Sequence, residues 1–169
     1  MELFEAIDKR HSYRGEYVDR PVPRDDLRRI VQAGIQAPSG CNAQTTAFVI
    51  IDDPDLMARL RQIVPISAPA AIVCVADPTP AYKDTSFALE DCAAAVENML
   101  LAITALGYAS VWLDGALRGG KGAMVGELLG IPEGRRVQVI LPVGVPAEQR
   151  VQRERKPFEE RAFFNTCQG

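Results

Sequence analysis

A cluster of polar side chains near the N-terminus has the residue types of a binding site. Arg10-His11-Ser12-Tyr13-Arg14 places two arginines, a histidine and a serine hydroxyl within five residues. Guanidinium groups offer rigid, paired donors, so this cluster can hold a phosphate or another ligand with several acceptor atoms. The alternative is a solvated helix end, and the cluster alone does not decide between the two.

Two further segments carry groups suited to a ligand. The turn-rich stretch 37–44 contains Ser39, Asn42 and Gln44, and the two amides both donate and accept. They suit a ligand edge that alternates donors and acceptors, such as a flavin pyrimidine ring, although an ordinary loop with Asx turns is the alternative. Near the C-terminus, Arg153 and Arg155 precede a proline and can form a second cationic arm for a phosphate, or a solvated charged tail.

A glycine-rich stretch offers a competing interpretation. Residues 115–122, GALRGGKG, match the G-x-x-x-x-G-K pattern of a loop that binds nucleoside triphosphates. The next position of that pattern is Ser or Thr, whose hydroxyl holds Mg²⁺, but here it is Gly122. The alternative is a glycine-rich turn between a strand and a helix, and we expect this turn rather than a triphosphate site. The dinucleotide pattern G-x-G-x-x-G is absent from the sequence.

The cysteines do not predict a metal site. The four cysteines include no C-x-x-C pair, and the sequence contains one histidine, so close zinc-ligand pairs are missing. We expect a reducing cytoplasm as the compartment. Cys41 lies within the 37–44 stretch, where it is either a redox thiol or an inert side chain, and we expect the inert role.

Composition excludes several classes of protein. The 169 residues are 47% hydrophobic and 24% charged, which is ordinary for a globular chain and predicts one domain over residues 1–169. The net charge of −3 does not favour nucleic-acid binding. The longest apolar run, 68–76, is far shorter than the ~20 residues of a membrane span. The acidic start does not resemble a signal peptide.

The periodicity of apolar residues predicts the elements that must position these groups. Leu27, Ile30 and Val31 form one stripe of a helix. The longest helix is apolar nearly all round and is therefore buried, in the core of this fold or of a dimer. We expect helices over 2–9, 24–36, 55–62, 86–106 and 123–129, and strands over 47–51, 70–76, 109–113 and 137–143.

Taken in order, these segments resemble the nitroreductase family of FMN-dependent oxidoreductases. Residues 10–14 resemble its R-[RH]-S-x-R signature, and 37–44 resemble A-P-S-x-x-N-x-Q. Residues 97–112 resemble the family's long central helix and the strand after it, and 142–146 resemble P-x-G-x-P. Two features depart from the family. Thr45-Thr46 stand where Pro-Trp or a similar pair often follows the glutamine, and the segment between Val75 and Glu90 leaves little room for lid helices.

The resemblance implies an α+β fold, with a central, mostly antiparallel sheet flanked by helices, and an intertwined homodimer. It also implies FMN at the dimer interface. Arg10 and Ser12 are expected at the FMN phosphate and ribityl chain, with His11 beside them and Arg14 near the pyrimidine. Arg153 and Arg155 are expected to complete the grip on the phosphate.

Two other segments gain a role from the resemblance. Pro38, Ser39 and Asn42 are expected to reach the flavin of the other subunit, with Gln44 supporting their loop. Leu113, Asp114 and Gly115 are expected to bring backbone N–H groups near flavin N5 and O4.

The activity that the resemblance implies needs no catalytic side chain, because the flavin carries the chemistry. NADH or NADPH binds transiently and passes a hydride to flavin N5. A small-molecule oxidant such as a nitroaromatic, quinone or enone then takes the electrons in a ping-pong cycle. The alternatives are a non-catalytic flavin-binding or sensing protein and the nucleotide-binding loop described above.

Overall fold

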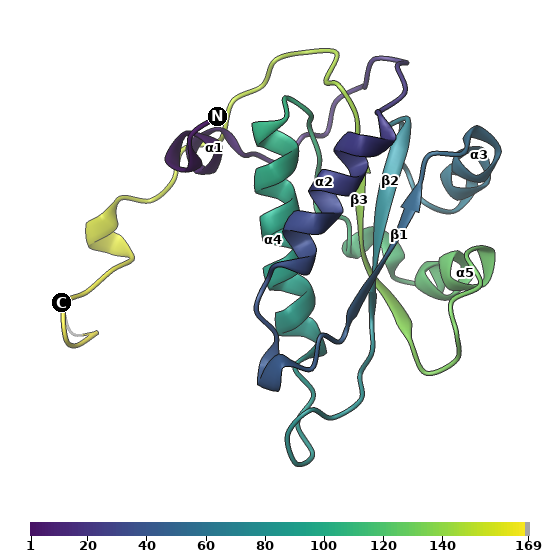
Figure 1. Ribbon diagram of the computed structural model, residues 1–169. Coiled ribbons are helices and arrows are strands. Elements are labelled where there is room, and N and C mark those ends of the chain that lie inside the picture. The colour runs from purple at the N-terminus through teal and green to yellow at the C-terminus, as the bar shows by residue number, and fades with distance from the viewer. Residues whose placement is uncertain (168–169) are drawn as a thin grey trace.

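A three-stranded antiparallel sheet forms the centre of the protein (Figure 1). The structure is a computed structural model, and it describes residues 1–167. The strands are β1 (Thr46–Ile51), β2 (Ala70–Ala76) and β3 (Arg136–Val143), in the order β1-β2-β3. Every residue of β2 is buried, because this apolar strand is paired on both edges and covered on both faces. The three strands confirm the predictions for 47–51, 70–76 and 137–143.

Helices cover both faces of the sheet (Figure 1). On one face lie α2 (Arg24–Ile35) and α4 (Ala88–Ala105), and on the other lie α3 (Pro54–Ile63) and α5 (Lys121–Leu128). The alternation of side chains along β2 divides the core accordingly. Ile72 packs toward α2 and α4, whereas Val73 packs toward α3 and α5. This arrangement confirms the α+β class and the antiparallel sheet.

Close packing joins the two helices that lie over the same face. Gly34 of α2 lies against Met99 of α4, and a Cβ at Gly34 would stand 2.9 Å from Met99 Cγ. The α4 helix therefore runs tightly beside α2, with Val96, Met99 and Ile103 fully buried. The predicted burial of the long helix is confirmed for this face, while Leu89 on another face stays exposed.

The expected strand over 109–113 is wrong as a continuous element. Ala109 pairs with Gly144, Ser110 with Ser12, and Leu113 with Ile140, each as an isolated bridge. Ala109 and Leu113 both pair with the segment 140–144, whereas Ser110 between them pairs with Ser12, so no ladder of successive pairs forms. The segment nevertheless joins the N-terminal chain to β3, which places residues 10–14 beside 109–113.

The glycine-rich stretch 114–122 also differs from the expected open loop. It contains a 3₁₀ turn, η2 (Gly115–Leu117), and α5 already begins at Lys121 rather than at 123. Gly119 and Gly120 take positive φ angles of 66° and 85°, which favour glycine and let the chain turn into the helix.

The two ends of the chain lie outside the layered body (Figure 1). Helix α1 (Leu3–Lys9) packs beside α4, and the C-terminal segment with η3 (Phe158–Glu160) runs past α1 and away from the sheet. Both ends expose large apolar side chains: Leu3, Phe4, Ile7, Val151, Phe158, Phe163 and Phe164. No helix within residues 1–167 combines the length and the apolar character needed to cross a bilayer.

Candidate functional site

The polar segment 10–14 is fixed by backbone hydrogen bonds on both sides. The Arg10 N–H closes α1 by donating to Ala6 O at 2.9 Å, and the Tyr13 N–H donates to Ser110 O at 2.8 Å. Ser12 and Arg14 are exposed, whereas Tyr13 between them is buried, as expected for alternating side chains in an extended chain. The segment thus presents different residues to its two faces.

One face leads to a hollow rich in arginine, of about 480 Å³. Here Arg10 meets Arg153 and Arg155, which come from the other end of the chain. Arg10 Nε lies 3.4 Å from Glu97 Oε1, and the Arg155 guanidinium donates to Gln152 Oε1 at 2.8 Å. The hollow holds more cations than anions, which suits a phosphate. Its charged lining consists of Arg10, Arg153, Arg155, Arg161, Asp8 and Glu97.

Arg161 was missing from the predicted site. It follows η3, six residues after Arg155, and the turn of the chain at 157–161 returns it to the same hollow. The only signal in the sequence was the continuation of the charged stretch beyond Pro157. That signal is weak, because charge runs near chain ends are commonly solvated.

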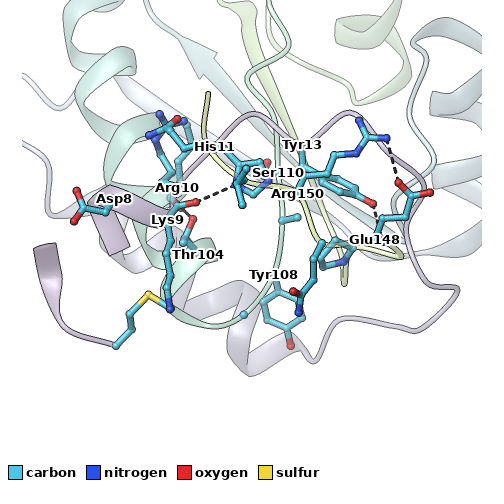
Figure 2. A pocket seen from close by; sticks show the side chains of 18 residues that line it. Asp8, Lys9, Arg10, His11, Tyr13, Thr104, Tyr108, Ser110, Glu148 and Arg150 are labelled. Carbon is cyan, nitrogen blue, oxygen red and sulfur yellow. Dashed lines mark hydrogen bonds and ion pairs between the residues drawn. The ribbon is translucent and has the colours of Figure 1, made fainter. Parts of the chain in front are cut away.

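His11 and Tyr13 line a different cavity, of about 590 Å³, which Figure 2 shows. The His11 Nδ1 lies 2.9 Å from the Lys9 carbonyl oxygen and donates to it in the Nδ1–H tautomer. His11 Nε2 and Ser110 Oγ are buried there without a hydrogen-bond partner among the described residues. Arg150 lies 5.8 Å from the Tyr13 ring centroid, over its face. His11 therefore faces this cavity and is not among the residues that line the arginine hollow.

Arg14 and Leu113 share a third hollow, of about 560 Å³, with Tyr17. The Tyr17 hydroxyl is buried without a partner among the described residues, and burial raises its pKa above the ordinary value. This unpaired hydroxyl and the Arg14 guanidinium give the hollow two polar groups that are suited to a ligand.

The backbone N–H groups of 113–115 are largely engaged within the chain. The Leu113 N–H donates to Ile140 O at 3.1 Å, and the Gly115 N–H donates to the Asp114 carboxylate at 2.6 Å. Asp114 lies in no helix or strand, and among the described residues its N–H donates to no backbone carbonyl. Of the three amides expected to face a flavin, the one at Asp114 is thus the most available.

The turn-rich stretch forms a compact loop at the start of β1. Pro38, Ser39 and Gln44 line a fourth hollow, of about 380 Å³, whereas Asn42 is exposed outside it. The Ser39 Oγ accepts a hydrogen bond from the Gln44 N–H at 3.0 Å, which joins the two ends of the loop. The 3₁₀ turn η1 (Gly40–Asn42) lies between these two residues.

The structure gathers the predicted residues into groups rather than into one site. Helix α4 carries contacts to two of them, because Glu97 pairs with Arg10 and Asp91 bonds to the 39–45 loop. Asp91 and Glu97 are about 9 Å apart along the helix axis and about 120° apart around it. In Figure 1 the loop lies at the opposite end of α4 from α1. Within one chain, the loop and the arginine hollow therefore remain separate.

The donor groups of these hollows fit separate parts of a flavin mononucleotide. The arginine hollow matches a doubly charged phosphate, and Arg14 with the unpaired Tyr17 hydroxyl suits the polar edge of a ring. Among residues 1–167, no three His, Cys, Asp or Glu side chains are placed to hold a metal ion. The structure does not favour a triphosphate site in the stretch 115–122. Gly122 offers no hydroxyl for Mg²⁺, and the segment before the stretch is not a continuous strand.

Comparisons with known proteins find relatives over most of the chain. The model of the nitroreductase family matches residues 7–74 and 62–145. A protein of Archaeoglobus fulgidus named "Putative NADH dehydrogenase/NAD(P)H nitroreductase" is 35% identical over 155 residues, which are 88% of each chain. A crystal structure from Parabacteroides distasonis with the same name superposes with a TM-score of 0.84 at 25% identity, covering 97% of this chain and 98% of that one.

A further solved structure shares the fold. An "FMN-dependent Nitroreductase" from Clostridium difficile superposes with a TM-score of 0.82 at 24% identity, covering 96% of this chain and 99% of that one. The resemblance found in the sequence motifs is confirmed by the match to the family model and by the relative from Archaeoglobus fulgidus. The chain belongs to the nitroreductase family.

Proposed function

We propose that the protein is an FMN-dependent oxidoreductase that passes a hydride from NADH or NADPH, through the flavin, to a small-molecule oxidant. Nitroaromatics, quinones and enones are the oxidant classes that we propose. The observation that carries this proposal is the hollow where Arg10 meets Arg153 and Arg155 from the far end of the chain. The names of the relatives in Archaeoglobus fulgidus and Clostridium difficile support it.

The arginine hollow has the task of binding the phosphate. Arg10 and Ser12 contact the phosphate and ribityl chain, and Arg153 and Arg155 complete the grip, with Arg161 as an additional cation. The Glu97 carboxylate holds Arg10 at 3.4 Å in the free protein, so the incoming phosphate competes with it for the same guanidinium. His11 lines the adjoining cavity, which Arg10 also lines, and orients the backbone through its bond to Lys9 O.

The polar groups around the ring control its electron affinity. FMN, when bound, supplies hydride acceptance at N5 and delivery to the oxidant. Arg14 places positive charge near the pyrimidine, where negative charge gathers on reduction, and this favours the reduced form. We assign the N5 side to the 113–115 segment, where the Asp114 N–H is the most available donor.

We also propose a homodimer in which each flavin contacts both subunits. Pro38, Ser39 and Asn42 reach the flavin of the partner, with Gln44 supporting their loop. Two observations support this arrangement: the loop is separate from the arginine hollow within one chain, and both chain ends expose large apolar side chains. Size-exclusion light scattering tests it, and a stable monomer with tight FMN binding would contradict it.

The proposal also covers the domain organisation, the compartment and nucleic acid as a partner. We propose a single domain over residues 1–169, because the two core clusters share one sheet. We propose a reducing, cytoplasmic compartment, because Cys41, Cys74, Cys92 and Cys167 are free thiols. Nothing in the charge balance favours nucleic acid as a partner.

Titration of the flavin-free protein with FMN and with riboflavin tests the proposed site. Riboflavin carries the same ring but no phosphate, so it cannot use the arginine hollow. We expect quenching of flavin fluorescence at much lower concentrations of FMN than of riboflavin. Equal affinities for FMN and riboflavin would show that the arginine hollow does not bind the phosphate. A protein that binds neither flavin would contradict the proposed function.

A further inference from the structure

Asp91 is a buried carboxylate for which the assigned site gives no role. It lies in the first turn of α4, close to the helix N-terminus, and is 5% exposed. Burial of a carboxylate costs free energy unless hydrogen bonds replace its lost water. Asp91 and Ser110 are the buried polar residues within the described part of the chain. The position of Asp91 therefore calls for an explanation in terms of its partners.

Both carboxylate oxygens bond to the two ends of one loop. Oδ1 accepts the Gly40 N–H at 2.8 Å, and Oδ2 accepts the Thr45 hydroxyl at 2.7 Å. Gly40 opens the turn η1, and Thr45 is the last residue before β1. One rigid side chain on the longest helix thus fixes both ends of the segment 40–45.

The loop between these anchors is held in conformations that an unsupported chain avoids. Cys41, Asn42 and Gln44 have φ angles of 52°, 56° and 52°, in the left-handed region that non-glycine residues rarely adopt. Such conformations persist only where the surrounding contacts determine them, and they occur at functional sites. The contacts that hold this loop are the Asp91 bonds to Gly40 and Thr45 and the bond from the Gln44 N–H to Ser39 Oγ.

Close packing adds to the constraint at one end. A Cβ at Gly40 would stand 2.2 Å from the ring of Phe87, which immediately precedes α4. The Gly40 backbone therefore lies directly against the start of α4, where the Asp91 carboxylate receives its N–H. The loop has little freedom to shift while this contact and both Asp91 bonds are present.

We propose that Asp91 is a positioning residue of the flavin site, which acts through the 40–45 loop to place Ser39, Asn42 and Gln44. This inference rests on the proposed function, in which Ser39 and Asn42 reach the flavin of the partner subunit and Gln44 supports their loop. Asp91 does not touch the flavin itself. Thr45, which departs from the family's usual residue, is the group through which one carboxylate oxygen acts.

Three variants separate this role from others. Asp91→Ala removes both anchors. Asp91→Asn removes the charge but keeps an oxygen for the Gly40 N–H and offers an N–H to the Thr45 hydroxyl. Thr45→Val removes one anchor and leaves the buried carboxylate, so it keeps the proposal testable if Asp91→Ala does not fold. Tyr108→Phe is the matched control, because it deletes a tertiary hydrogen bond to Asp26 (2.7 Å), which lies in the first turn of α2, at the opposite end of that helix from the 40–45 loop.

The readouts are the FMN dissociation constant and the midpoint potential of the bound flavin. We expect Asp91→Ala to weaken FMN binding by about 10- to 100-fold and to shift the potential, because small misplacements of binding groups have effects of this size. Thr45→Val should weaken binding by about 3- to 10-fold, the range for one hydrogen bond. Asp91→Asn and Tyr108→Phe should stay within about 3-fold of the parent.

Each outcome has one reading. If the parent binds no flavin, the proposed function fails before this inference is tested. If the parent binds FMN and Asp91→Ala and Thr45→Val match Tyr108→Phe in affinity and potential, the positioning role is wrong while the proposed function stands. If Asp91→Asn shifts the potential as much as Asp91→Ala does, charge rather than loop geometry is responsible, which overturns the proposal.

Discussion

The arginine hollow and the 40–45 loop are built in opposite ways. The hollow combines one segment next to α1 with a tail from the other end of the chain, and Arg153, Arg155 and Arg161 are exposed. The loop is anchored within the layered body by the buried Asp91, which bonds to both of its ends. One region gathers four guanidinium groups beside two carboxylates, and the other is held in place by hydrogen bonds within the chain.

This difference indicates which part of the site a bound ligand stabilises. Four guanidinium groups near one another repel, and carboxylates such as Glu97 offset that repulsion in part. A phosphate would offset it further, so the hollow should tighten when FMN binds. The loop needs no ligand, because its left-handed residues are fixed by contacts within the chain.

The largest expected effect is on the hollow. Arg10→Ala should weaken FMN binding by about 10- to 100-fold, the equivalent of a hydrogen bond to a charged group. The free energy of unfolding of the flavin-free protein should change little, because Arg10 makes one long ion pair with the half-exposed Glu97. Flavin fluorescence titration and urea unfolding measure the two quantities.

Lys121→Ala is the control for that variant. It removes a cation from the glycine-rich stretch that resembles a triphosphate loop, outside the arginine hollow. We expect FMN affinity to stay at the parent value. If Lys121→Ala weakened FMN binding as much as Arg10→Ala, the phosphate would have been assigned to the wrong region.

The loop should show the reverse pattern. Gly40→Ala forces a Cβ against the Phe87 ring, at 2.2 Å, so the start of α4 or the loop must shift. We expect the flavin-free protein to lose about 1–3 kcal/mol in its free energy of unfolding, as overpacked sites do. Urea denaturation measures it. A Gly40→Ala protein with parental stability would show that the loop is not held in place before the ligand binds.

Salt should distinguish the two regions next. Raising the ionic strength from about 0.01 M to 0.15 M shortens the Debye length from about 30 Å to 8 Å. FMN affinity should fall, because the exposed arginines act at a distance, whereas riboflavin affinity should hold. The same titrations, repeated in both buffers, provide the measurement. Parallel losses for the two ligands would argue against a phosphate in the hollow.

The smallest effect concerns an ion pair remote from both regions. Arg24 donates two hydrogen bonds to the Asp52 carboxylate, one of them at 2.9 Å, and these bonds hold the pKa of Asp52 below its usual range. A carboxyl whose pKa is lower in the folded state stabilises the fold above its unfolded pKa and loses that contribution as the pH falls through the folded value.

Asp52→Asn should therefore be slightly less stable than the parent near neutral pH, and the difference should shrink as the pH falls. Urea unfolding at about pH 7 and about pH 3, on either side of the ordinary aspartate pKa, measures it. A difference that grew in acid would contradict the assigned direction of the pKa shift. The Arg24 side chain is largely solvated and Asp52 is partly exposed, so this pair gives a baseline for the Arg10–Glu97 pair.

The sequence predicted the elements whose periodicity is strong. Strand β2 was predicted to the residue, because an apolar run of seven between loops has few alternatives. The segment 109–113 was predicted as a strand, but its pairing is divided between two distant segments, around Ser12 and at 140–144, which the local pattern does not reveal. Likewise, the start of α5 at Lys121 depends on two glycines with positive φ.

The site was predictable in its residue types and less so in its geometry. The resemblance named Arg10, Arg153 and Arg155, which the structure brings into one hollow. Arg161 was missed, because only the turn at η3 returns it there. Asp91 was missed as well, because its partners Gly40 and Thr45 are 51 and 46 residues away in the sequence. A buried carboxylate in a helix looks, in sequence, like any first-turn acid.

The central claim is that the protein binds FMN and that NAD(P)H reduces it. The most direct test is the visible absorption spectrum of the purified protein loaded with FMN, recorded before and after anaerobic addition of NADH or NADPH. We expect flavin bands that bleach on addition of the reductant and return when a quinone or nitroaromatic is added. Flavin bands that stay unchanged with either reductant would contradict the oxidoreductase and favour a binding or sensing protein, and a protein that takes up no FMN would contradict the site itself.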